Sequence, residues 1–148
     1  MNDKLRWICE KDKIEMDALL KVEETLRIRF PKDYIEFIIT HDGAYPIPNI
    51  FEINGNEEVF NNLLSFDEES CINIVDTYND VQDRLIEKII PFAEDPFGNL
   101  ICFDYRNKTH PTIVFWDHEK AFSNKENAIS YICNTFSELL DMLRASEE

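Results

Sequence analysis

The chain has 148 residues, of which 44% are hydrophobic and 12% are aromatic, and only three are glycine. This composition is typical of one packed domain over residues 1–148, with a core over about 14–143, and excludes a disordered or repetitive chain. Neither a signal-peptide core nor an apolar run of about 18 residues is present, so we expect a cytoplasmic protein without a membrane span.

The charge is strongly negative and unevenly distributed. The formal net charge is -15 at pH 7, and residues 42–104 hold 14 acids but only two bases, Arg84 and Lys88. An acidic surface repels nucleic acid and anionic membranes, whereas it attracts a basic protein. Solubility alone also accounts for an acidic composition. Charge therefore leaves both interpretations open.

Four cysteines are present, and none forms a CxxC pair. Their wide spacing, mostly within apolar segments, is typical of small core residues in a reducing compartment. They are Cys9, Cys71, Cys102 and Cys133.

Apolar residues at helical spacing predict two helices near the N-terminus. The first runs from Lys13 to about Arg29, because the residue before Pro31 is disfavoured in a helix. The second begins at Pro31 and ends at Gly43, which is placed for the left-handed conformation that closes a helix. Residues 3–13 fit either a short helix or a frayed arm.

The middle of the chain predicts strands. Residues 50–53 and 59–66 flank the strong turn signal Asn54-Gly55. Residues 89–118 contain three apolar runs of strand length, and Asp95-Pro96-Phe97-Gly98 separates the first two. These runs predict the centre of an antiparallel sheet, and they cover residues 89–93, 100–105 and 112–116.

Residues 67–69 are acidic and precede a segment, 71–85, that we predict to be a helix because the helix dipole favours negative charge at its start. A strand over 72–75 is the alternative. Residues 119–126 predict a loop, 128–132 are ambiguous, and 134–143 predict a final helix. The fold class is therefore α+β, a mostly antiparallel sheet with N-terminal and C-terminal helices packed on one side.

Three ordered blocks of this sequence resemble the SUKH superfamily, which groups Smi/Knr-type cell-wall regulators with bacterial immunity proteins. The first is Phe30-Pro31-Lys32-Asp33-Tyr34-Ile35-Glu36-Phe37 with His41-Asp42-Gly43 after it. The second lies within residues 90–118, and the third is Thr135-Phe136-Ser137-Glu138-Leu139-Leu140. The resemblance spans about residues 14–143, with Asp42 standing where the family usually has Asn.

This resemblance implies an immunity protein, or antitoxin, that binds a cognate polymorphic toxin and blocks it by stoichiometric binding. It implies a nuclease toxin, either a DNase or an RNase, encoded by the adjacent gene. The eukaryotic branch of the superfamily implies an alternative, a non-catalytic scaffold or regulator of cell-envelope assembly. Neither role involves direct binding of nucleic acid or membrane.

Sequence motifs for catalysis are lacking, so we expect neither enzymatic activity nor a cofactor. The chain has no GxSxG, P-loop or HExxH motif. The best metal candidate is Asp117-His118-Glu119 with Asp104 on the next strand. Adjacent strand residues point to opposite faces, so a polar strand end is the preferred interpretation and no metal is expected.

The acidic residues become the candidate toxin contacts if the immunity hypothesis holds, because they can pair with Lys or Arg of a nuclease. A solvated acidic face is the alternative. One member of the Phe115-Trp116 pair is expected to be partly exposed, and Trp116 is a candidate anchor, with half-buried scaffold as the alternative. The candidate contacts are Glu57, Glu58, Asp67, Glu68, Glu69, Asp76, Asp80, Asp83 and Trp116.

Overall fold

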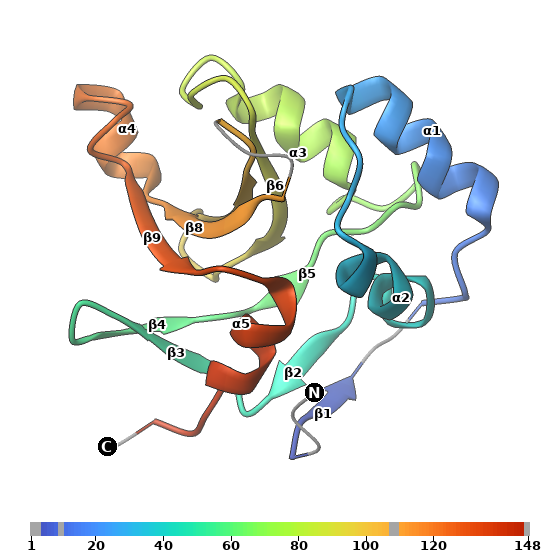
Figure 1. The fold of residues 1–148 in the computed structure, drawn as a ribbon, viewed down its shortest axis with the longest axis horizontal. Helices are drawn as coiled ribbons and strands as arrows, with labels where there is room; N and C mark the ends of the chain where they lie inside the picture. The colour runs from blue at the N-terminus through green and yellow to red at the C-terminus, as the bar shows by residue number, and fades with distance from the viewer. Residues whose placement is uncertain (1–3, 9–10, 107–109, 147–148) are drawn as a thin grey trace.

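The computed structural model describes residues 4–8, 11–106 and 110–146 (Figure 1). Its centre is a five-stranded antiparallel sheet with the strand order β5-β6-β7-β8-β9. The predicted meander and the α+β class are confirmed. The strands are β5 (Asn62–Leu63), β6 (Ile89–Glu94), β7 (Leu100–Asp104), β8 (Thr112–Trp116) and β9 (Ile129–Cys133).

Two smaller antiparallel pairs lie beside this sheet. β1 (Arg6–Ile8) pairs with β2 (Tyr45–Ile47), so neither a helix nor a frayed arm is correct for this part of residues 3–13. β3 (Ile50–Ile53) pairs with β4 (Asn56–Val59) around the predicted Asn54-Gly55 turn. The predicted strand over 59–66 is therefore mostly wrong, since β4 ends at its first residue and β5 covers two more.

The helices are α1 (Met16–Leu26), α2 (Lys32–His41), α3 (Ile74–Val81), α4 (His118–Ser123) and α5 (Phe136–Met142). α1, α2 and α5 confirm predicted helices, and Gly43 has the expected positive φ, 69°. α3 is shorter than predicted at both ends, since Asn73 caps its start and it ends at Val81. The predicted loop over 119–126 is wrong in its first half, where Asp117 caps α4 by accepting hydrogen bonds from the backbone of Glu119 and Lys120.

The central sheet is buried on both faces. Phe115 belongs to the larger hydrophobic cluster, which packs against α1, α2 and α5, whereas Trp116 belongs to a smaller cluster that includes Ala121 of α4. The predicted packing of the N-terminal and C-terminal helices on one side is confirmed for α1, α2 and α5, whereas α4, which was not predicted, covers the other side. Trp116 is 0% exposed and Phe115 is 6% exposed, so neither is a surface anchor.

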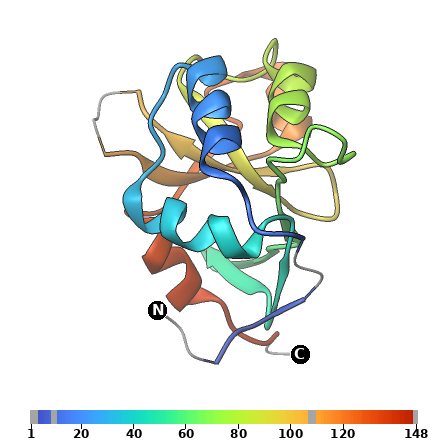
Figure 2. The same ribbon diagram turned by 90° about the vertical axis from the view of Figure 1, so that its right-hand side faces the viewer.

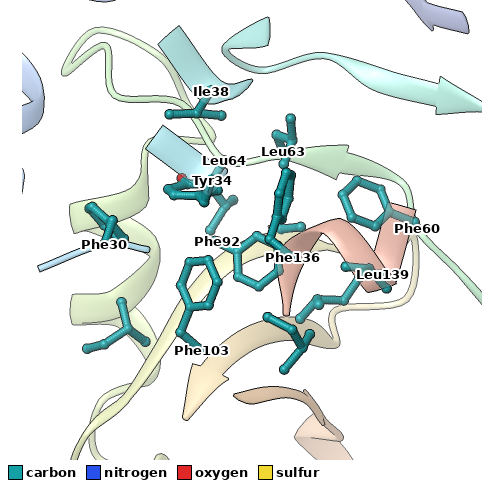
Figure 3. Close-up of a cluster of buried hydrophobic side chains, with 14 of the residues drawn as sticks. Phe30, Tyr34, Ile38, Phe60, Leu63, Leu64, Phe92, Phe103, Phe136 and Leu139 are labelled. Atoms are coloured by element: carbon teal, nitrogen blue, oxygen red, sulfur yellow. The ribbon is translucent and has the colours of Figure 1, made fainter. Parts of the chain in front are cut away.

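Aromatic rings from α2, β6, β7 and α5 meet in the larger cluster (Figure 3). The rings of Phe92 and Phe103 stack with centroids 4.2 Å apart, and the Tyr34 ring meets Phe136 edge-on at 5.3 Å. Each fully buried side chain of this size stabilises the fold by about 1.5–3 kcal/mol. This core holds α2 against the sheet.

The cysteine prediction is confirmed for Cys102 and Cys133, which are buried, and wrong for Cys71, which is exposed. Cys9 lies outside the described residues. Burial raises the pKa of the Cys102 thiol well above its ordinary value, which disfavours the reactive thiolate. In the part of the chain that the structure describes, no helix has the length and apolar character needed to cross a membrane.

Candidate functional site

A groove runs between α1 and the chain that leads into α3. It consists of two adjoining hollows of about 510 and 740 Å³, which share Ala18, Phe66 and Asp67. Figure 2 shows α1 and α3 side by side, with the chain that leads into α3 below that helix. We name this feature the acidic groove. Its lining includes residues 11–15, 17, 18, 21, 22, 25, 42, 65–69 and 73–76.

Carboxylates dominate the polar lining of the acidic groove. Eight acids and three lysines line it, above apolar side chains such as Ile14, Val22 and Phe66. The arrangement can bind a basic protein segment through ion pairs and its apolar parts through the floor. The acids are Asp12, Glu15, Asp17, Asp42, Asp67, Glu68, Glu69 and Asp76, and the lysines are Lys11, Lys13 and Lys21.

The wall of the groove opposite α1, which we name the far wall, carries Asp76 on α3 and three acids on a closed loop. This loop, residues 65–74, is named the acidic loop. Both ends of this loop are joined at Ser65, whose N–H donates to Ile72 O at 2.9 Å and whose carbonyl accepts from Ile74 N at 2.8 Å. The Asn73 side chain then caps α3 by accepting from Asp76 N at 2.8 Å and donates to Ser70 O at 3.0 Å. These hydrogen bonds, which use no charged side chain, hold both ends of the loop.

Asp42 fixes the start of the acidic loop from the end of α2. Its carboxylate is 2% exposed and accepts hydrogen bonds from Ser65 Oγ at 2.6 Å and Phe66 N at 2.9 Å. Burial raises the pKa of Asp42, and these two hydrogen bonds oppose the shift because they stabilise the charged form. Asp42, which stands where the family usually has Asn, is therefore a structural part of the groove.

Two lysines bridge the acidic groove. Lys11 Nζ lies 3.2 Å from Asp67 Oδ2, and Lys21 Nζ lies 2.6 Å from Glu68 Oε1. The backbone N–H of Glu69 and the Lys11 ammonium lower the pKa of Asp67. Both pairs are exposed, so each contributes little to stability and can exchange for a partner's cation.

The SMI1 / KNR4 family (SUKH-1) matches residues 13–142, which include nearly all of the acidic groove. This chain belongs to that family. The resemblance found in the sequence is thereby confirmed, and SUKH proteins are typically non-catalytic immunity proteins in toxin systems.

A curated relative of this SUKH-1 chain comes from Bacillus subtilis (strain 168). It is the SPbeta prophage-derived uncharacterized protein YokK, which is 38% identical over 77 residues. The match covers 52% of this chain and 36% of the relative, so it spans little more than a third of that protein.

The acidic groove of this SUKH-1 protein brings together four of the candidate contacts named from the sequence, Asp67, Glu68, Glu69 and Asp76. Asp80 is also exposed, farther along α3, and Asp83 is exposed in the turn that follows this helix.

The remaining candidates lie elsewhere. Glu57 pairs with Arg144 at 2.7 Å, and burial together with Asp95 and Asp117 raises the pKa of Glu58 on the same strand, β4. Trp116 is buried beneath α4, so the structure corrects its placement as a surface anchor.

Sequence reasoning missed two features of the groove. One is the near wall, which α1 and the segment before it form, and the other is the structural support of the far wall. Asp12, Glu15 and Asp17 come from the N-terminal segment, whose nearly balanced charge gave no signal. The support of the far wall did leave a signal, because Asn73 followed three residues later by Asp76 has the spacing of a capped helix start.

The tripeptide considered for a metal has structural contacts instead. Asp117 caps α4, and His118 Nδ1 lies 2.7 Å from Asn99 Oδ1. Asp104 pairs with Arg106 at 2.9 Å. Across the described ranges, no three His, Cys, Asp or Glu side chains are grouped so that they could hold a metal ion.

Proposed function

We propose that this protein is a cytoplasmic immunity protein that binds a cognate polymorphic toxin and neutralises it stoichiometrically, without catalysis. Membership of the SUKH-1 family over residues 13–142 supports this role. Blocking by binding requires a complementary surface and no turnover, so the protein needs neither a nucleophile nor a metal for it.

The acidic groove is the observation that carries the proposal. Seven exposed carboxylates against three lysines make it complementary to a basic surface. Nucleases present Lys and Arg to the phosphates of their substrate, and carboxylates can occupy the same cations. The proposed partner is therefore a basic nuclease toxin encoded by the adjacent gene, and Lys11 and Lys21 release Asp67 and Glu68 to it.

The proposal is tested with the product of the adjacent gene. We expect co-expression of this protein to restore growth of cells that express that product. We expect purified protein to abolish its nuclease activity at a one-to-one molar ratio. Full inhibition at a small fraction of that ratio would indicate turnover and contradict blocking by binding. A neighbouring gene that encodes no toxin would favour the cell-envelope scaffold instead.

A further inference from the structure

Phe122 is a large apolar side chain held at the surface. It lies on α4 and is 74% exposed, although the preceding Ala121 is buried at 5%. A single exposed apolar residue is common on protein surfaces and needs no function. Phe122 differs because its ring contacts Arg84, which also contacts the buried Trp116.

Arg84 connects the Phe122 ring to the buried Trp116. The Cζ atom of Arg84 lies 5.0 Å from the centroid of the Phe122 ring and 5.4 Å from the Trp116 ring. The Trp116 indole Nε1 also donates to Arg84 O at 3.4 Å. The exposed ring therefore has a preset position, and ordering it on binding costs less entropy than ordering a free side chain.

A row of carboxylates leads from the acidic groove to this ring. Asp76 and Asp80 on α3 and Asp83 in the turn that follows it are exposed and spaced four and three residues apart, which places them along one side of this segment. The helical turn continues past Val81, because Leu85 N donates to Val81 O at 3.1 Å. At 1.5 Å per residue, the row from Asp76 to Arg84 is about 12 Å long.

This distance fits one protein interface. A standard interface covers about 800 Å² on each partner, roughly 30 Å across, so one partner can contact both the acidic groove and Phe122. Interfaces of this kind place an aromatic anchor in a pocket and surround it with polar contacts. The row also disfavours a second copy of this chain, because like charges would meet across the contact.

We propose that Phe122 is the apolar anchor of the interface with the basic toxin. This inference rests on the proposed function. The toxin lies along α3, with its Lys and Arg on Asp80 and Asp83, and an apolar pocket of the toxin receives the Phe122 ring. Arg84 is a positioning residue that holds this ring against Trp116.

Substitution at position 122 tests this placement, with the product of the adjacent gene as the probe. We expect Phe122→Ala to raise the Kd by roughly tenfold or more, because the anchor is lost. Phe122→Tyr keeps the ring and is expected to stay within about threefold of the original Kd. Ile47→Ala is the control, because Ile47 is 48% exposed on β2, at the end of the molecule opposite α4 (Figure 1).

Calorimetric titration and thermal unfolding of all four proteins separate the outcomes. If the unmodified protein does not bind, the proposed function fails. If it binds and Phe122→Ala binds as tightly as Ile47→Ala, the proposed anchor is wrong and the proposed function stands. Self-association of the unmodified protein that Phe122→Ala abolishes would assign this surface to a second copy and also overturn the proposal.

Discussion

At the scale of single residues, Asp42 links the stability of the fold to pH. Its buried carboxyl group has a raised pKa, so the folded protein holds this proton more tightly than the unfolded chain. Its contribution to stability is complete below the ordinary carboxyl pKa of 3.8 and decreases as the pH rises through the raised value. Asn at this position cannot ionise and avoids that decrease.

We therefore expect Asp42→Asn to become more stable relative to the original protein as the pH rises from 4 to 7. The amide oxygen can still accept from Phe66 N, and its NH2 can donate to Ser65 Oγ. Urea unfolding of both proteins at each pH isolates Asp42, because the other titrating groups are shared. A stability difference that does not change with pH would contradict the raised pKa.

Asp42→Ala is the contrasting variant, because it removes both acceptors. The buried Phe66 N–H and the Ser65 hydroxyl then lose their Asp42 partner, which is expected to cost about 1–3 kcal/mol of unfolding free energy at pH 4.

At the scale of elements, the cap of α3 also determines the shape of the acidic loop. We expect Asn73→Ala to lower the free energy of unfolding by about 1 kcal/mol, because Asp76 N loses its acceptor. Asn73→Ser is the matched control, because it keeps a capping oxygen and, like Ala, lacks the amide that donates to Ser70 O and Asp76 Oδ2. Urea unfolding measures the loss. Equal destabilisation by both substitutions would show that the cap hydrogen bond is not responsible.

Periodicity was sufficient for elements that bury a regular stripe. α1, α2, α5 and the β6-β7 hairpin could be predicted because apolar spacing and turn residues agree in each. α4 could not, since six mostly polar residues contain one buried side chain, Ala121. Without α4, one face of β8 was left uncovered, and this is why Trp116 was expected to reach the surface.

Other features depended on contacts between distant segments. β1 exists through its pairing with β2, nearly 40 residues later, and its three residues carry no strand pattern of their own. The acidic residues in the middle of the sequence were sufficient to predict the far wall of the acidic groove. The near wall at Asp17 could not be predicted, because only the packing of α1 beside α3 brings it there.

At the scale of the whole molecule, the position of the negative charge matters beyond its total. We expect the combined substitution of Glu68, Glu69 and Asp76 by Lys to slow association with the toxin by roughly tenfold at low salt and to weaken its salt dependence. Stopped-flow association at several salt concentrations measures both effects. Unchanged kinetics would remove the acidic groove from the mechanism.

The control for this experiment changes the net charge equally outside the groove. Glu24, Glu36 and Asp141 are exposed and do not line the groove, so their combined substitution by Lys is expected to slow association less. Equal slowing by both triple variants would assign the effect to the overall field of the protein.

The acidic groove is assembled from residues 11–25, Asp42 and residues 65–76, which come together only in the folded chain. A toxin that binds the groove therefore binds no part of the unfolded protein with comparable affinity, and binding and folding become thermodynamically linked. At a free toxin concentration of 100 times Kd, this linkage adds about 2.7 kcal/mol to the free energy of unfolding. The complex should then resist proteolysis longer than the free protein, and the supply of toxin would set the lifetime of its inhibitor.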